Sequence, residues 1–344
     1  MAHCHGSFYA RRLICFPIRE EVVIVSAIVI ILLFLLGLVL IIKGGDYFVD
    51  AASWIAEASG VPKFLIGATI VSLGTTMPEL LVSLMASAEG SIGIAVGNAV
   101  GSVTANVGLI MGISLVCIAA EVNRREQGFN FVMMVAAIGL LLAFSLSGGL
   151  SIPEALILLA MFLAYMVQSV LSARKAIKSD SSEDKPGTDR RTVVTNIIKF
   201  VAGVAGIVIG ARLMVDYGTA LARLLRVPES IIGATLVAIG TSLPELVTTV
   251  TAIVKKQSSL SIGNIVGANI IDLTLILPLC SVVSGKALPI LSQNITLDMP
   301  VCLGLCLLAV APPMLTRRFH RWQGVAMLVC YAAYVVVLCT AFAA

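Results

Sequence analysis

The chain has 344 residues, of which 59% are hydrophobic and 12% are charged, and its formal net charge is +4. An average soluble domain has roughly 45–50% apolar and about 25% charged residues. The composition therefore excludes a soluble globular protein and indicates an integral membrane protein.

Ten apolar runs follow an N-terminal tail of residues 1–21. The first run, residues 22–42, is long enough at about 1.5 Å per residue to cross a hydrocarbon layer of about 30 Å. It is too long for a signal peptide and lacks a small-residue cleavage site before the polar stretch GGDYFVD, so we interpret it as retained. Continuous runs of this length predict helices and not the alternating segments of a β-barrel. The other nine runs are residues 64–88, 92–118, 129–147, 152–172, 193–213, 229–254, 259–284, 296–314 and 322–342.

The tail and the cysteines predict no resident metal, disulfide or cofactor. His3, Cys4 and His5 stand together near a chain terminus, where such a cluster is more often incidental than a metal site. The eight cysteines contain no CxxC pair, and most lie inside apolar runs, where cysteine behaves as a small hydrophobic residue.

The positive charges indicate an orientation. With ten spans, the loops after the odd-numbered spans hold fifteen Lys and Arg residues and the other side holds seven, including Arg11, Arg12 and Arg19. The positive-inside rule then predicts a protein of the cell inner (cytoplasmic) membrane with both termini outside. Nucleic-acid binding is excluded, because no basic region lies beside the aromatic residues that a strand binder needs.

The chain contains an internal repeat with an offset of 166 residues. Residues 61–81, VPKFLIGATIVSLGTTMPELL, match residues 227–247, VPESIIGATLVAIGTSLPELV, at 12 of 21 positions. A polar linker, residues 173–192, separates a first five-helix repeat (22–172) from a second (193–344). Because each half has an odd number of spans, the repeats are predicted to be inverted in the membrane, as is typical of secondary transporters.

Each half carries a charged motif that interrupts an apolar span. The motifs GTTMPE (74–79) and GTSLPE (240–245) place a proline inside a helix, which frees the carbonyl of Gly74 or Gly240 four residues earlier. Irregular backbone at membrane depth is tolerated only where it is buried in protein or lines a watery cavity. Hydroxyl and carboxylate side chains stand beside each break: Thr75, Thr76 and Glu79 in the first copy, and Thr241, Ser242 and Glu245 in the second.

The following span of each half adds GNAVGSVTANVG (97–108) and GNIVGANIIDLT (263–274). Their GxxxG spacing allows close helix approach. Asn106 follows Glu79 by 27 residues, and Asp272 follows Glu245 by 27, so the polar positions recur in register. Ser102 lies four residues before Asn106, and Ala268 four before Asp272.

All of these candidate ligands are oxygen atoms. Hard oxygen ligands favour Ca²⁺ or Na⁺ and argue against zinc or copper. No basic residue lies in the central parts of these spans, so a bound cation is the simplest counter-charge for glutamates whose burial in a membrane is costly.

At these residues the sequence resembles the calcium/cation antiporter superfamily, whose repeats carry G-[ST]-[ST]-x-P-E and G-N-x-x-G-S-N-x-x-[ND]. The resemblance spans nearly the whole chain and is strongest at 67–112 and 233–278. It implies a central Ca²⁺ site at Glu79 and Glu245 with the backbones of Thr75 and Thr241, completed by Asn106 and Asp272. It implies an outer Na⁺ site formed by Thr241, Ser242, Glu245 and the Ala238 carbonyl, and an inner one formed by Thr75, Thr76, Glu79, Ser102 and the Ser72 carbonyl.

Two positions depart from the family pattern. Val103 stands where the family usually has Asn, and Ala268 stands where a Ser would face the outer Na⁺ site. Asp272 is similar to the residue of the potassium-dependent branch, so K⁺ stays open as a further ion.

The sequence therefore predicts an all-α membrane antiporter that exchanges Ca²⁺ for Na⁺ and needs no protein partner. A Ca²⁺/H⁺ antiporter on the same scaffold and a cation channel are the alternatives. An intramembrane enzyme is excluded, because the spans lack the aspartate pair of aspartyl proteases and the G-x-S-G motif with His of rhomboid-type enzymes.

Overall fold

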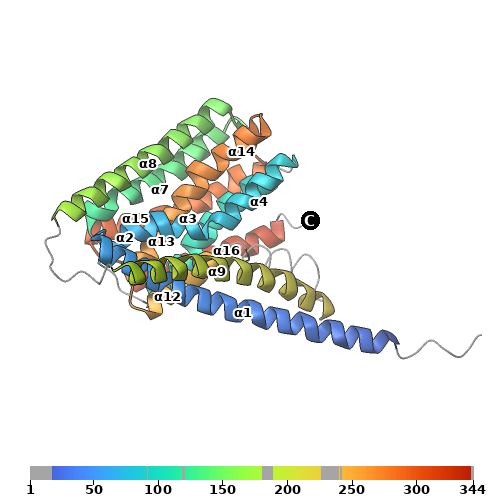
Figure 1. Ribbon diagram of the computed structural model, residues 1–344. Helices are drawn as coiled ribbons and strands as arrows, with labels where there is room; N and C mark the ends of the chain where they lie inside the picture. The colour runs from blue at the N-terminus through green and yellow to red at the C-terminus, as the bar shows by residue number, and fades with distance from the viewer. Residues whose placement is uncertain are drawn as a thin grey trace, which may run out of the picture.

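The protein is a bundle of long helices in this computed structural model (Figure 1). The structure describes residues 18–90, 92–117, 121–179, 189–225, 240 and 242–341, and their side chains from residue 27 on. In the first half the elements are α1 (Ile18–Ser59), α2 (Lys63–Ile66), η1 (Gly67–Val71), α3 (Ser72–Thr75), α4 (Met77–Ala88), α5 (Ile92–Ala105), η2 (Asn106–Met111), α6 (Gly112–Cys117), α7 (Arg124–Ser145), β1 (Gly149–Leu150) and α8 (Ile152–Ser179), where η marks a π-helical segment.

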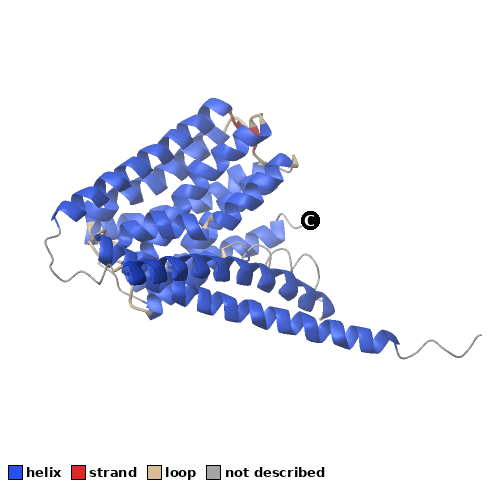
Figure 2. Cartoon of the chain, viewed as in Figure 1, coloured by secondary structure: helices blue, strands red, loops and turns tan. Residues whose placement is uncertain are grey.

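The second half has a similar order of helices, but its strand precedes α15 instead of following it, and its segment η5 has no counterpart in the first half. It consists of α9 (Arg190–Leu224), α12 (Leu243–Val254), α13 (Ser258–Ile271), η4 (Asp272–Ile276), α14 (Leu277–Ser284), β2 (Leu288–Pro289), η5 (Asn294–Asp298), α15 (Met299–Thr316) and α16 (Arg321–Ala341). The strands β1 and β2 pair antiparallel at one tip of the bundle (Figure 2). This pairing joins the loop after α7 to the loop after α14, and so links the two halves.

The membrane spans agree with the sequence for most of the chain. Eight described helices are long and apolar enough to cross a membrane, and the pair Lys63–Thr75 and Met77–Ala88, bent by 46°, adds a ninth. The one remaining expected span is residues 229–254, the seventh in chain order. The structure describes only its second half, where α12 is a shorter apolar helix. Nine spans and one shorter apolar helix therefore stand in the described residues where the sequence predicts ten.

Helix α1 differs from the expectation that the first span ends at residue 42. It begins at Ile18 and continues through the polar stretch GGDYFVD to Ser59. The reason is close packing on α9: a Cβ atom on Gly44 would lie 2.7 Å from the backbone nitrogen of Ile207, so this glycine serves helix contact and does not end the helix. Helices α8 and α9 likewise extend into the expected linker, to Ser179 and from Arg190.

The most deeply buried spans are α5 and α13, which form the centre of the bundle. Helix α13 packs against α2 and η1 with almost no side chain between the backbones. A Cβ on Gly263 would lie 2.2 Å from the carbonyl oxygen of Phe64, and one on Gly67 would lie 2.3 Å from that of Leu260. The glycines therefore bring the second half of the chain into direct contact with the helix that leads to Glu79.

This close approach predicts that Gly263→Ala destabilises the protein, since overpacking a tight contact costs about 1–3 kcal/mol. Thermal unfolding in detergent should show a lower melting temperature for this variant. Gly139→Ala is the matched control, because no atom lies within 4 Å of its added Cβ. This control should be neutral or stabilised by up to about 1 kcal/mol, the usual gain of replacing helical glycine by alanine. Equal melting temperatures for the two variants would contradict the contact.

Candidate ion-binding site

The two proline motifs lie at equivalent helix starts, α4 in the first half and α12 in the second. Thr76 breaks the path between α3 and α4 with φ −82° and ψ 0°, and Ser242 precedes α12 with φ −87° and ψ 6°. Pro78 and Pro244 lie in the first turn of α4 and α12, where a residue without an N–H group is tolerated. Each break therefore places a glutamate in the first turn of a helix that begins inside the protein.

Three carboxylates lie together at these breaks. Glu79, Glu245 and Asp272 are each about 1% exposed. Glu79 interacts electrostatically with both of the others, and Asp272 interacts with Glu245. Oε1 of Glu245 accepts a hydrogen bond of 3.3 Å from Oγ1 of Thr76. The other five carboxylate oxygens accept no hydrogen bond from the described residues.

Two π-helical segments begin at the polar positions of the neighbouring spans. Asn106 starts η2 and Asp272 starts η4, at equivalent places in the repeat. Such π-bulges inside α-helices occur frequently at functional sites. Nδ2 of Asn106 donates to Oδ1 of Asn269 at 3.1 Å, and no described residue donates to the Oδ1 atom of Asn106. This amide oxygen thus adds to the unpartnered acceptors.

The other expected ligands that the structure describes are buried, but they differ in their hydrogen bonds. Oγ1 of Thr75 donates toward the Ser72 carbonyl and toward Oδ1 of Asn264. The Ser72 carbonyl also accepts the backbone N–H of Thr76 at 2.9 Å, so it is not free of the helix. The hydroxyls of Ser102 and Ser242 are buried and have no hydrogen-bond partner among the described residues. Thr241 and Ala238 lie outside the described residues.

The sequence reasoning missed three residues that hold these groups in place. Asn264 and Asn269 are fully buried and contact Thr75 and Asn106. Both stand inside the quoted motif of residues 263–274, so their amide side chains were a readable signal. The third is Tyr165 of α8, whose hydroxyl donates to the carbonyl of Ala68 in η1. A single aromatic residue in an apolar run gives no such signal.

The three carboxylates have no basic partner among the described residues. Within the part of the chain that the structure describes, no Lys, Arg or His forms an ion pair with Glu79, Glu245 or Asp272. In that part no group of three or more His, Cys, Asp and Glu side chains is arranged to hold a metal ion alone. A cation here would therefore take hydroxyl, amide and carbonyl oxygens beside the carboxylates.

Replacing Asn269 by Val, the residue at the equivalent position 103, removes the acceptor for the Asn106 amide. We expect a loss of about 1–3 kcal/mol in the free energy of unfolding, the cost of leaving a buried donor unsatisfied. Chemical or thermal unfolding in detergent measures it. The control is Asn196→Val, whose amide only donates to the Thr192 carbonyl within its own helix. The network is not as described if both variants are equally stable.

Comparison with known proteins identifies the family of this chain. The family described as sodium/calcium exchanger protein matches residues 29–171 and 195–340. The sodium/calcium exchanger MaX1 of Methanosarcina acetivorans is 34% identical over 352 residues, covering 89% of this chain and 97% of the relative. An uncharacterized membrane protein of Methanocaldococcus jannaschii is 32% identical over 303 residues, covering 87% of this chain and 94% of the relative.

Solved structures show the same fold. The sodium-calcium exchanger NCX_Mj soaked with 2.5 mM Na⁺ and 10 mM Sr²⁺ has a TM-score of 0.78 and 31% identity, covering 90% of this chain and 99% of the other. The same exchanger soaked with 2.5 mM Na⁺ and 0.1 mM Ca²⁺ has a TM-score of 0.76 and 32% identity, with 90% and 99% covered. The family match, the relatives and the shared helical fold establish the chain as a multi-pass membrane transport protein of the sodium/calcium exchanger family.

Proposed function

We propose that the protein is a secondary antiporter that exchanges Ca²⁺ for Na⁺ across the cytoplasmic membrane by alternating access. The observation that carries this proposal is the group of Glu79, Glu245 and Asp272, three buried carboxylates without a basic partner in the described residues. Charged groups inside a membrane usually mark an ion path, because their burial is costly unless something compensates it. A transported cation supplies that compensation.

Calcium suits the centre of this site. Ca²⁺ takes six to eight oxygen ligands in flexible geometry, and carboxylates, amides, hydroxyls and backbone carbonyls all qualify. Glu79 and Glu245, with the backbones of Thr75 and Thr241, form the proposed central site, and Asn106 and Asp272 complete it. The unpartnered oxygens of Glu79, Asn106 and Asp272 support this assignment.

Sodium binds on either side of the centre in this proposal. The inner site uses Thr75, Thr76, Glu79, Ser102 and the Ser72 carbonyl, and the outer site uses Thr241, Ser242, Glu245 and the Ala238 carbonyl. The buried, unpartnered hydroxyls of Ser102 and Ser242 support it. Because Na⁺ and Ca²⁺ then compete for the same glutamates, binding of one ion opposes binding of the other, which couples their movements.

The proposed architecture is two inverted repeats of five helices each, residues 22–172 and 193–344, joined by the linker 173–192. Both termini lie outside, and the tail 1–21 precedes the first repeat. Two features support the repeat: the breaks at Thr76 and Ser242 have nearly the same dihedral angles, and η2 and η4 begin 166 residues apart. No resident cofactor or protein partner is needed for this function.

Glu79→Gln and Glu245→Gln each remove a charge that would hold the cation, so both should abolish ⁴⁵Ca²⁺ uptake into proteoliposomes loaded with Na⁺. Both proteins should still elute as single species after extraction, because the amide keeps the shape of the side chain. Glu121→Gln, an exposed glutamate outside the breaks, is the control and should transport normally. Normal uptake by either site variant would refute the site assignment.

Ala268 bears on the identity of the coupling ion. It is fully buried and lacks the hydroxyl that the family pattern has at this position. Ala268→Ser should therefore raise the apparent Na⁺ affinity in the same uptake assay, while Ala155→Ser, buried at the start of α8, should leave it unchanged. An unaltered Na⁺ dependence in Ala268→Ser would mean that position 268 does not face a Na⁺ ion.

The counter-ion is tested by comparing vesicles loaded with Na⁺, with Na⁺ and K⁺, or with a pH gradient alone. Sodium/calcium exchange requires internal Na⁺, and a further need for K⁺ would give Asp272 a role in K⁺ binding. Uptake driven by the pH gradient alone would show that the coupling ion is H⁺ and not Na⁺. Flux that needs no counter-ion and does not saturate would indicate a channel instead.

A further inference from the structure

The π-helical segment η1 leaves one buried carbonyl without its usual donor. In an α-helix the N–H group of Ser72 would donate to the carbonyl of Ala68, four residues earlier. In the structure this N–H group donates to the carbonyls of Gly67 and Thr69 instead. Ala68 is fully buried, and buried carbonyls are nearly always hydrogen-bonded. The Ala68 carbonyl therefore needs a donor from another part of the protein.

The hydroxyl of Tyr165 is that donor. Tyr165 lies on α8, is fully buried, and donates to the Ala68 carbonyl. On another side the same carbonyl lies against α13, because a Cβ atom added to Gly267 would overlap its oxygen. Helix α8 also contacts η4, the segment that begins at Asp272. The carbonyl is thus enclosed by the centre of the bundle, with the tyrosine hydroxyl as its donor.

The register of η1 determines the direction of the side chains that follow it. One extra residue in a helix turns everything after it by about 100°, since 3.6 residues complete a turn. Thr75 follows η1 in α3, and its hydroxyl donates to Oδ1 of Asn264 at 3.2 Å. The hydroxyl of Thr76 donates to Oε1 of Glu245 at 3.3 Å. An α-helical register in η1 would turn both hydroxyls away from these partners in the second half.

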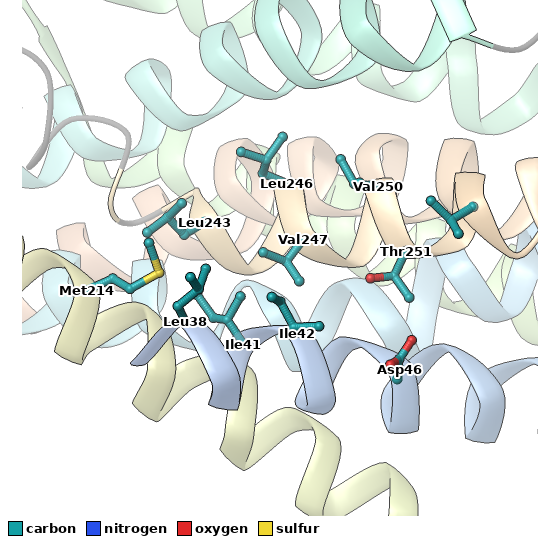
Figure 3. A pocket seen from close by; sticks show the side chains of 11 residues that line it. Leu38, Ile41, Ile42, Asp46, Met214, Leu243, Leu246, Val247, Val250 and Thr251 are labelled. Carbon is teal, nitrogen blue, oxygen red and sulfur yellow. The ribbon is translucent and has the colours of Figure 1, made fainter. Parts of the chain in front are cut away.

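The corresponding helix start in the second half is less enclosed. Figure 3 shows Leu243, Val247 and Thr251 of α12 along an apolar cavity of about 410 Å³, which α1 and α9 also line. The proposed outer Na⁺ site takes Ser242 and Glu245 from the same helix start. A change at η1 should therefore act first on the inner Na⁺ site, whose ligands directly follow the enclosed segment.

We propose that Tyr165 is a positioning residue for the inner Na⁺ site. Its hydroxyl holds the Ala68 carbonyl, and with it the π-helical register that turns Thr75 and Thr76 toward the second half. The proposal rests on the proposed function, which assigns these two residues and the Ser72 carbonyl to the inner site. Tyr165 does not touch the ion, since it acts through the carbonyl one turn before Ser72.

Tyr165→Phe tests this role because it removes the hydroxyl and keeps the ring that packs in the bundle. The Na⁺ concentration for half-maximal ⁴⁵Ca²⁺ uptake into proteoliposomes should rise about three- to tenfold, the usual effect of losing one hydrogen bond. The KM for Ca²⁺ should change by a smaller factor. The reason is that the proposed Ca²⁺ site takes only the Thr75 backbone from this segment, whereas the inner Na⁺ site takes three of its residues. Equal factors for the two ions would overturn the proposal.

Tyr334→Phe is the matched control. Tyr334 is also a buried tyrosine, and its hydroxyl donates to Oδ1 of Asp298 at 3.0 Å, between α16 and η5. Its loss removes a hydrogen bond of at least equal strength, because the acceptor is a carboxylate. The Na⁺ dependence should nevertheless match that of the wild-type protein. A shift of equal size in both variants would reflect a general loss of stability and would overturn the proposal.

Hydrogen exchange of the backbone amides tests the register without any ion. The amides of residues 67–76 should exchange about three- to tenfold faster in Tyr165→Phe than in the wild-type protein, because local opening loses the same hydrogen bond. They should exchange at the wild-type rate in Tyr334→Phe. Unchanged exchange in Tyr165→Phe would overturn the proposal, even if the Na⁺ dependence shifts.

The two measurements separate this proposal from the proposed function. If wild-type uptake does not depend on Na⁺, the proposed function fails, and faster exchange in Tyr165→Phe still shows that the hydroxyl holds the register. If wild-type uptake depends on Na⁺ and Tyr165→Phe leaves that dependence unchanged, the function stands and the positioning role fails.

Discussion

The whole arrangement depends on burying three carboxylates in the middle of a membrane bundle. Desolvating an ionised carboxylate costs several kcal/mol unless a charge or hydrogen bonds compensate it. Among the described residues only hydroxyl groups compensate directly, because the Thr76 hydroxyl donates to Glu245, the Thr75 hydroxyl also interacts with Glu245, and no basic side chain pairs with the three carboxylates. The proposed cation would supply the missing compensation, and the unpartnered side-chain oxygens near the proline breaks and π-helices are the groups that could bind it.

Glycine determines how closely the two halves can approach this site. Gly67, Gly263 and Gly267 let α13 lie directly on η1 and α3, so residues almost 200 positions apart in the sequence meet, as Thr75 and Asn264 do. Close backbone contact at glycines also joins α1 to α9, at Gly37, Gly44, Gly203 and Gly210. In a membrane, where lipid solvates apolar side chains as well as protein does, such close backbone contact is a main source of helix association. The glycines thus divide the bundle into a central unit and a pair of helices at its edge.

Much of this was predictable from sequence because the relevant residues are unusual in an apolar context. Glu79 and Glu245 stand out by charge and Pro78 and Pro244 by backbone chemistry, so the broken helices and the buried carboxylates were expected. The predicted end of the first span at residue 42 was wrong. Gly44, Gly45 and Asp46 are typical of a loop in the sequence, but in the structure Gly44 packs against α9 and the helix continues to Ser59. The π-helical segments that start at Asn106 and Asp272 depend on tertiary packing and were not predicted. The hydrogen bond from Tyr165 to the Ala68 carbonyl was not predicted either, because a single tyrosine in an apolar run gives no sequence signal. The positions of Thr241 and Ala238 stay predictions.

The repeat treats two kinds of residue differently, and the difference follows from what each must do. At the centre, both copies keep the same chemistry, since the glutamates and prolines are identical and Asn106 and Asp272 both offer side-chain oxygens to the proposed ion. A ligand must offer the same atoms to the ion whichever side is open. At the ends of the spans the two copies differ, since Asp46 corresponds to Arg212 and Lys255 to Glu89, whereas Asp50 and its equivalent Asp216 are both aspartate. Residues at the span ends lie away from the proposed cation, so their charges can differ between the copies, whereas a positive charge at position 79 would stand where the cation is proposed to bind.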